Sequence, residues 1–378
     1  MDGRAANLAL AAASLGLALL AAEGGVRLLS PIGPALLVTD PVVGKRYVPG
    51  FHGSVFVDEA ARHVEVQINS RGFRGPERPR RKAAGRLRVA VLGDSMTAAL
   101  ATDEERTFVR RLEAALSRDG RPSVEVMNFG VSSASTASEL LTWRSVVAEY
   151  APDLVLLAFF TGNDLADNCS RLTHAPRVYF ELDGTGRLQQ GPEPTPTPAV
   201  VRWLDLNSRL YAWQKVAFRR LRSAVRSGAA GVEPGQMIFA RGGHPDVEHA
   251  WRVTGALLGR MRDEVEASGA RFGVVVIPCA EQVDGALWAE LARGARGAGL
   301  DVDRQEPSRR LSTLFEREGI ASLDLAPVFG AASRRAGSAN DLYLLGRFHL
   351  SDEGHQVAAE AIHLFLTRGA GRPLLEPR

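Results

Sequence analysis

Cysteine is scarce in this chain of 378 residues, and neither sign of charge is in large excess. The two cysteines, Cys169 and Cys279, have no CxxC spacing and no neighbouring histidine cluster, so a metal site is not expected. They could pair in an oxidising compartment or remain as buried free thiols. The formal net charge of +3 is too small, over this length, to indicate a nucleic-acid partner.

Phosphate-binding loops are missing as well. The turn after the first predicted core strand reads GDSMTA at 93–98, which matches neither GxGxxG nor GxxxxGK followed by Ser or Thr. A nucleotide-binding protein is therefore disfavoured, and no cofactor is expected. The densest basic segment, residues 71–88, is interrupted by glycine and proline. Such a segment is typical of a solvated linker, and a contact with anionic lipid headgroups is the alternative.

The longest uncharged run lies near the amino terminus. It extends from Ala5 to Ala22, with Arg4 before it and Glu23 after it. As a helix it would reach about 27 Å, which is nearly the thickness of a bilayer core. A signal anchor, a cleaved signal peptide and a buried alanine-rich helix all fit residues 1–30. Either of the first two places the rest of the chain outside the cytoplasm, in the periplasm or beyond.

Regular alternation of helices and strands begins after residue 86. Residues 31–86 are rich in Gly, Pro and Arg, and short alternating stretches such as 63–69 indicate small strands there. The later alternation predicts a three-layer α/β/α domain over 87–370, around a mostly parallel five-stranded sheet. Strands are predicted at 87–93, 123–130, 153–160, 271–278 and 320–325. Helices are predicted at 105–118, 247–267, 311–318 and 352–366, and an amphipathic helix that ends near Tyr150 is predicted after the second strand.

Residues 165–243 interrupt this alternation. They include the turn-rich PEPTPTP at 192–198 and an aromatic, basic helix around Trp203 and Trp213. We expect an insertion above the sheet, which could be a lid over the site, a surface facing a partner or a packed structural element.

Four residues stand where predicted strands end or the last helix begins. Ser95, in GDSMT, follows the first strand; Gly130 closes the second; Asn163, in TGND, follows the third; and His349, in FHLSDEGH, precedes the last helix. Active sites of open α/β sheets form at the carboxyl ends of the strands. Each signal is weak by itself, but four in this order are hard to explain as turn residues.

Together these residues resemble the SGNH hydrolase superfamily, also called GDSL esterases and lipases, over residues 86–366. The flanking sequences RVAVLGDSMT, VEVMNFGVSS, PDLVLLAFFTGNDLADN and HLSDEGHQVAAEAI carry the same resemblance. The amino-terminal apolar run with AEGGVRLL, and INSRGFRG at 68–75, are similar to a membrane-anchored bacterial branch. The resemblance implies a flavodoxin-like SGNH fold with an added transmembrane helix.

The resemblance also implies a mechanism. Ser95 would attack an ester with His349 as its base, and the oxyanion hole would combine the backbone N–H groups of Ser95 and Gly130 with the amide of Asn163. Asp94 would mainly shape the turn. His355, inside the last helix, would be a packing or capping residue.

The sequence departs from the family at one point. An aspartate usually stands two or three residues before the catalytic histidine, where this chain has Arg347 and Gly346. A backbone carbonyl near Gly346 could orient His349 instead, Asp341 could reach back through a loop, or the enzyme could be inactive. Loss of the orienting acid can slow a serine hydrolase by about ten-thousand-fold.

Three functions therefore remain open. The first is an esterase acting on an acyl or O-acetyl ester at the cell envelope, with a small-molecule, lipid or glycan substrate. An envelope O-acyltransferase would use the same residues and pass the acyl group to a sugar hydroxyl. The third is a catalytically inactive binding protein. The sequence does not indicate the oligomeric state.

Overall fold

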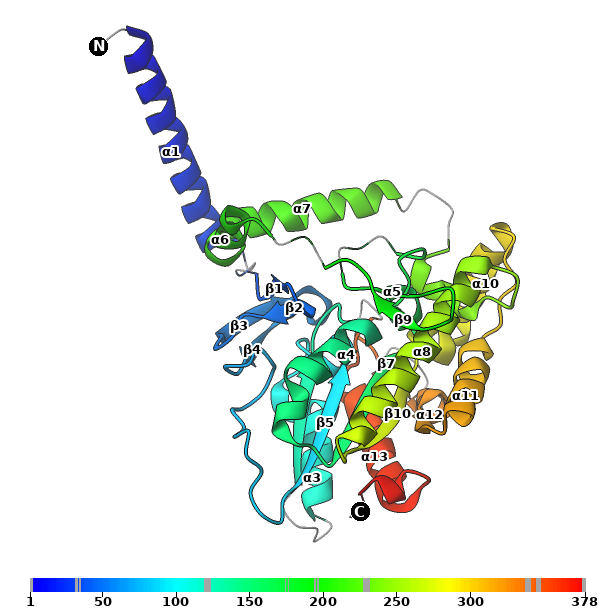
Figure 1. Ribbon diagram of the computed structural model, residues 1–378. Coiled ribbons are helices and arrows are strands. Elements are labelled where there is room, and N and C mark those ends of the chain that lie inside the picture. Colours follow the sequence, from blue (N-terminus) through cyan, green and yellow to red (C-terminus); the bar gives the residue numbers. More distant parts are fainter. Residues whose placement is uncertain are drawn as a thin grey trace. The chain divides into compact units, whose positions relative to one another are not determined.

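A five-stranded parallel sheet, in the order β11–β10–β7–β5–β6, forms the centre of the fold (Figure 1). The computed structural model describes residues 3–375, apart from 31–32, 34, 119–123, 174, 176, 194, 196, 227–231, 337–340 and 345–347. The predicted α/β architecture is confirmed. The strands are β5 (Leu87–Gly93), β6 (Val124–Gly130), β7 (Leu154–Phe160), β10 (Arg271–Ile277) and β11 (Ala321–Asp324).

Helices cover both faces of this sheet, which is why its strands are continuous apolar runs. On one face α3 (Phe108–Arg118) packs against β6 and against α13 (Asp352–Arg368). On the other face α4 (Thr136–Ser145) packs against β5 and α8 (Pro245–Ala267). The central strand β7 is buried along its whole length.

The register brings the carboxyl ends of the strands to one edge. Gly93 at the end of β5 pairs with Gly130 on β6 and with Ala158 on β7. Phe160 at the end of β7 pairs with Ile277 at the end of β10. The segments that follow these four strands therefore start side by side.

Smaller hairpins precede and interrupt the main sheet. Before it come β1 (Leu37–Asp40) with β2 (Gly44–Tyr47), and β3 (His52–Val57) with β4 (Arg62–Gln67), the latter pair joined by the short helix η1 (Asp58–Ala60). The strand predicted near 63–69 is β4. Within 165–243 lie the hairpin β8 (Phe180–Leu182) with β9 (Leu188–Gln190) and the short helix η4 (Pro234–Phe239).

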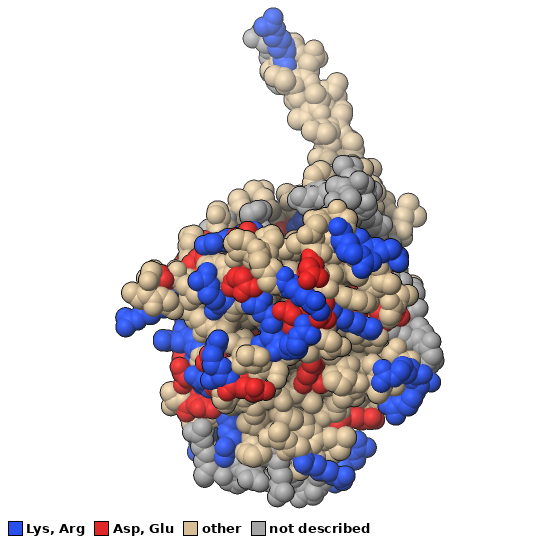
Figure 2. All heavy atoms as spheres, turned by 90° about the vertical axis from the view of Figure 1, so that its right-hand side faces the viewer, with Lys and Arg blue, Asp and Glu red and all other residues tan. Residues whose placement is uncertain are grey.

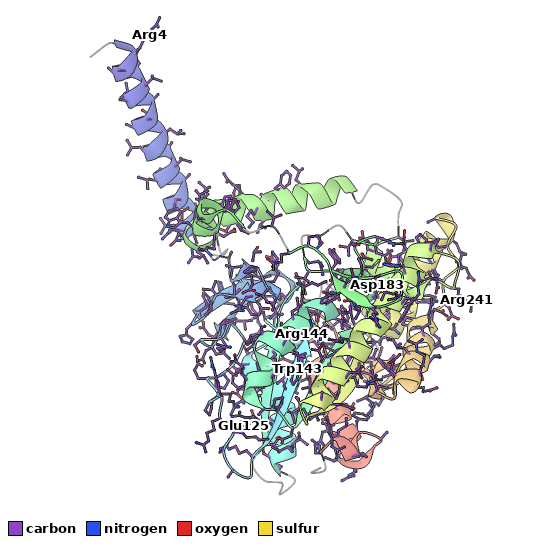
Figure 3. The ribbon with its side chains drawn as sticks, viewed as in Figure 1. Arg4, Glu125, Trp143, Arg144, Asp183 and Arg241 are labelled. Carbon is purple, nitrogen blue, oxygen red and sulfur yellow. The ribbon has the colours of Figure 1, made fainter. Side chains whose placement is uncertain are left out.

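Three helices differ from expectation. The helix that ends near Tyr150 was expected to be amphipathic, but α4 is buried from Thr136 to Trp143. The reason is that α8 packs against it, and Arg144 (Figure 3) donates two hydrogen bonds to Glu264 on α8. The helices α10 (Gly285–Gly297) and α12 (Ala326–Ala336) were not predicted; the predicted helix α11 (Glu306–Glu318) lies between them in the chain.

The chain forms two compact units. The larger comprises 39–196 and 230–378 and contains the sheet. The smaller comprises 1–38 and 197–229, with α1 (Gly3–Leu29), α6 (Ala199–Asn207) and α7 (Arg209–Arg226). In the described part of the chain, α1 is the one helix long and apolar enough to cross a membrane, which is consistent with an anchor or a signal sequence. The predicted segments 1–30, 31–86 and 87–370 stay a prediction.

Candidate active site

Ser95 begins α2 (Ser95–Ala98), a single helical turn directly after β5. Asp94 caps this turn, as predicted: its buried carboxylate accepts a hydrogen bond from the Met96 N–H at 2.8 Å. A Cβ on Gly93 would clash with Thr97, so only glycine lets the chain turn this sharply. The Ser95 side chain is half-exposed at the carboxyl edge of the sheet, where it can meet a substrate.

His349 is held at the same edge by an antiparallel bridge between Tyr343 and Leu350. The Leu344 N–H donates to the His349 carbonyl at 2.9 Å, and the Tyr343 hydroxyl donates to the Pro278 carbonyl at 2.8 Å, directly after β10. The imidazole Nδ1 lies 2.7 Å from Oε2 of Glu59. Glu59 belongs to η1, at the tip of the β3–β4 hairpin and 290 residues earlier in the chain. The pairing leaves Nε2 of His349 for another partner.

The charges at this edge act on one another. Burial disfavours the imidazolium, but the hydrogen bond and charge of Glu59, together with the charge of Asp94, hold the pKa of His349 above its ordinary value. Burial also raises the pKa of Asp94, against its hydrogen bond from Met96 and the charge of His349. His349 is therefore within electrostatic reach of the residue next to Ser95.

Asn163 follows β7 and precedes the short helix α5 (Asp164–Asp167). Its side-chain amide donates to Asp167 at 2.9 Å, and Asp167 pairs with Arg177 at 2.6 Å. These contacts fix the amide group. The same amide also hydrogen-bonds the Asp94 side chain, so it lies beside the serine turn. The neighbouring Asp164 is fully buried and accepts from the Phe160 N–H at 2.7 Å, which closes the turn.

Gly130 lies at the expected edge but is engaged elsewhere. Its N–H donates to Asn128 Oδ1 at 2.9 Å. A Cβ on Gly130 would clash with the backbone of Thr97 and Ala98. The glycine is therefore required because β6 passes close to the serine turn, and not because its N–H is open to a ligand.

The turn after Gly130 contains an unusual residue. It spans Val131 to Ala134, closed by a 2.9 Å hydrogen bond from the Ala134 N–H to the Val131 carbonyl. Its third residue, Ser133, is exposed and has a φ of 66°, where turns favour glycine. Among the described residues, none accepts the Ser133 N–H. Strained backbone of this kind is often found at functional sites.

Asp341 does not occupy the position considered for it. Tyr343 pairs with Leu350 in an antiparallel bridge, and the Asp341 carbonyl accepts from the Ser351 hydroxyl. The Asp341 side chain is exposed, and Glu59 occupies Nδ1 of His349. The alternatives involving Gly346 and Arg347 lie outside the described residues.

Sequence reasoning missed Glu59. An acidic residue in DEAARH, between two short strands, is an ordinary turn residue, and no periodicity connects it to His349. The available signal was indirect: a histidine without a nearby aspartate needs an acid from elsewhere in the chain.

Buried polar side chains with unpaired atoms lie near this edge. Both carboxylate oxygens of Glu139, Oδ1 of Asp164 and the hydroxyls of Thr97 and Ser135 have no hydrogen-bond partner among the described residues. Burial, with the charge of Asp94, raises the pKa of Glu139 and of Asp164 well above the usual values. The neutral carboxyl forms are therefore favoured.

The remaining candidates have structural roles. Cys169 and Cys279 are both free and buried, so they do not form a disulfide. His355 is buried in α13, where its Nδ1 accepts from the Phe108 N–H at 3.3 Å and its ring stacks on Phe108. Burial lowers the pKa of His355 to about 3. Within the described ranges no group of His, Cys, Asp and Glu residues could hold a metal ion.

A parallel α/β sheet with a serine turn after a central strand is typical of serine hydrolases of the SGNH class. A sequence profile of the GDSL-like lipase/acylhydrolase family matches residues 91–303. This is more than half of the chain, and the chain belongs to this family. The predicted enzyme class, an SGNH-type esterase, is confirmed by the match.

Solved structures give weaker likenesses. LAE5, an α/β hydrolase from the metagenome of Lake Arreo, is 15% identical, with 77% of this chain and 97% of that chain covered and a TM-score of 0.41. The acetyl xylan esterase AlAXEase is 14% identical, covering 73% of this chain and 98% of that one, with a TM-score of 0.40. A variant of the acetyl xylan esterase Axe2 from Geobacillus stearothermophilus is 13% identical, with 75% of this chain and 94% of that chain covered and a TM-score of 0.39. The comparison with curated proteins gives no match.

Proposed function

We propose that this chain hydrolyses a carboxylic ester with Ser95 as nucleophile, His349 as general base and Glu59 as the acid that orients the imidazole. The observation that carries the proposal is the 2.7 Å contact between His349 Nδ1 and Glu59 Oε2. A carboxylate at Nδ1 favours the tautomer whose proton is on Nδ1, which leaves Nε2 to accept the serine proton. The same contact stabilises the imidazolium that forms. An acid from the hairpin thus removes the main argument for an inactive protein.

The reaction then has two halves. Ser95 Oγ attacks the ester carbonyl carbon while its proton passes to His349 Nε2, and a tetrahedral intermediate forms. His349 returns the proton to the leaving oxygen, which departs as the alcohol and leaves an acyl group on Ser95. Water attacks this acyl group with His349 again as base, and the carboxylic acid leaves.

Donors at the same edge would stabilise the oxyanion. We assign the Ser95 N–H and the Asn163 amide to this role, each worth about 3 kcal/mol in the transition state. Because Asn128 engages the Gly130 N–H, we assign the third donor to Ser133, whose turn follows the same strand. The proposal keeps Gly130 as a packing residue.

A cavity of about 560 Å³ beside this edge supports binding of a neutral ester. Its wall includes Gly162, next to Asn163, and Phe348, next to His349. The size falls within the range of ligand pockets. Apolar side chains would hold an acyl chain, and carboxylates in the wall disfavour an anionic substrate. The apolar lining includes Phe160, Phe239, Leu287 and Leu291, and the acidic lining Glu233, Glu281 and Glu290.

The amino-terminal segments complete the proposal. We place α1 in the cell membrane as a signal anchor, with the esterase domain outside the cytoplasm; cleavage after secretion is the alternative. The hydrolase domain is proposed to span 87–370, with the insertion at 165–243. The segment 31–86 supplies Glu59, so it would belong to the catalytic unit instead of serving as a linker.

The full chain in detergent, treated with a fluorescent fluorophosphonate and with acetyl to octanoyl nitrophenyl esters, tests this function. The wild type is expected to label and to hydrolyse, and Ser95→Ala to do neither. Labelling without turnover would favour acyl transfer to a hydroxyl acceptor over hydrolysis. A wild type that neither labels nor turns over would contradict the proposal.

A further inference from the structure

Exposed apolar side chains concentrate on α6 and α7 in the smaller unit. Outside α1, eight large apolar side chains are exposed in the described part of the chain, and five of them belong to these two helices. Their exposed fractions run from 44% to 65%, although α6 and α7 form only a small part of the chain. The five are Val200, Trp203, Trp213, Phe218 and Leu221. A concentration of this kind marks an interaction surface.

The exposed residues of α7 lie on one side of the helix. At about 100° per residue, Leu221 lies about 80° and Phe218 about 140° around the axis from Trp213. Lys215, at about 200°, is outside this arc and exposed, and it pairs with Asp205 of α6 at 2.5 Å. The sequence of α7 contains arginine and lysine but no acidic residue. An amphipathic helix with Trp, Phe and Leu on one face and basic residues elsewhere is typical of helices that lie in a membrane interface.

The first turn of α7 is fastened to α1 at the end of its uncharged run. The Glu23 carboxylate accepts from the Ser208 hydroxyl at 2.8 Å and from the N–H groups of Arg209 and Leu210 at 2.9 and 3.0 Å. Arg27, one turn further along α1, donates to Glu23 at 2.7 Å and to the Asn207 carbonyl at 2.9 Å.

This fastening sets the level of α7 relative to the uncharged part of α1. Figure 2 shows α1 as uncharged side chains below a basic tip, and Figure 3 labels Arg4 there. Glu23 is the first charged residue after that stretch. In Figure 1, α7 leaves α1 at a steep angle. If α1 crosses a bilayer, α7 therefore runs along the bilayer surface.

We propose that α6 and α7 lie in the headgroup layer of the membrane that α1 enters, with their apolar side chains inserted and their basic residues on anionic lipid phosphates. The proposal rests on the proposed insertion of α1. It commits to a lipid surface because the apolar face, the basic sequence and the fastening to α1 all match an anionic bilayer.

Spin labels on the full chain in nanodiscs test the proposal. Cys169 and Cys279 are buried, so single cysteines can be introduced at Phe218 on the apolar face and Lys215 on the polar face. Ala289→Cys on the exposed part of α10 is the helical control in the larger unit, and Leu15→Cys reports insertion of α1 itself. The measurement compares relaxation by oxygen, which concentrates in lipid, with relaxation by a water-soluble nickel chelate.

In nanodiscs with phosphatidylglycerol, the labels at 15 and 218 are expected to be relaxed more by oxygen than by the nickel chelate. The label at 289 should be relaxed more by nickel, and the label at 215 should give an intermediate ratio. If the label at 15 is relaxed more by oxygen while the label at 218 gives the same ratio as the label at 289, then α1 is inserted but the interfacial proposal is wrong. If the label at 15 also favours nickel, the anchor and this proposal both fail. A label at 218 shielded from both reagents, in detergent as in nanodiscs, would indicate a protein partner and overturn the proposal.

Discussion

The two ends of the central sheet differ in whether their buried ionisable side chains have hydrogen-bond partners. At the amino end, Arg88 is fully buried, and its Nε donates to Glu125 (Figure 3) at 2.6 Å while its other nitrogens donate to three backbone carbonyls. At the carboxyl end, Glu139 and Asp164 are buried with unpaired carboxylate oxygens. A buried ion that is fully paired fixes structure, whereas unpaired buried polar groups lower stability.

The difference separates the part of the molecule that holds the fold from the part proposed to carry the reaction. The amino end connects the segment before β5 to the sheet through Arg88. The carboxyl end keeps Ser95 half-exposed, Ser133 at a positive φ, and polar atoms without partners. Substitutions at the amino end should therefore change stability and leave the chemistry unchanged, whereas substitutions of Ser95 and Asn163 at the carboxyl end should change the chemistry.

The largest expected effect is that of Ser95→Ala. Removal of the nucleophile should lower kcat/KM for nitrophenyl acetate by about ten-thousand-fold or more. The unfolding temperature should stay close to that of the wild type, because the side chain is half-exposed. Steady-state kinetics and thermal unfolding of the same samples check both parts. Residual activity near the wild-type level would contradict the assignment.

At the opposite end, Arg88→Met should lower the free energy of unfolding by about 3–5 kcal/mol. It removes the buried partner of Glu125, which keeps only its pairing with the more exposed Arg86, and it leaves three backbone carbonyls without their donor. Activity per folded molecule should be unchanged. The double variant Arg88→Met with Glu125→Leu should recover part of the loss, since neither charge then remains. Denaturant unfolding measures all three proteins. A loss of activity without loss of stability would reverse the comparison.

Asn163→Ala should lower kcat by about 10²–10³-fold, the usual loss of one oxyanion donor. KM should change less, because the contact strengthens only in the transition state. Ser133→Gly is the matched control: it keeps the backbone N–H and relieves the positive φ, so kcat should be retained. Equal losses in the two variants would show that the whole edge had been disturbed.

A smaller effect is expected for Glu139→Gln. The pKa of Glu139 is higher in the folded protein than in the unfolded chain. Its contribution to the free energy of unfolding is therefore most favourable below about pH 4.5, where the carboxyl is neutral in both states, and this contribution is lost as the pH rises. Glutamine does not titrate, so the variant should gain stability over the wild type between pH 5 and pH 9. Thermal unfolding across this range measures the gain, with the exposed Glu193→Gln as control. A difference that stays constant with pH would argue against a buried titrating carboxyl.

Local patterns in the sequence predicted most of the sheet and half of the site. The strands were predictable because the central ones are apolar runs buried on both faces. Ser95, Asn163 and His349 stand directly beside predicted elements. The role predicted for Gly130 stays a prediction, and its closeness to α2 could not be read from the sequence because it depends on tertiary packing.

Contacts between residues far apart in the sequence could not be predicted from local patterns. Glu59 contacts His349 only because the β3–β4 hairpin lies beside a residue 290 positions later in the chain. The burial of α4 likewise depends on α8, which follows a long insertion.

The central claim, that Glu59 orients His349 as the base for Ser95, is tested most directly by the pH dependence of fluorophosphonate labelling in the wild type and in Glu59→Gln. Glu65→Gln, exposed on the same hairpin, is the control. The charge of Glu59 raises the pKa of His349, so its removal should shift the acid limb of the profile to lower pH. The plateau rate should fall by up to about ten-thousand-fold, while Glu65→Gln matches the wild type. An unchanged rate and an unchanged acid limb in Glu59→Gln would contradict the account.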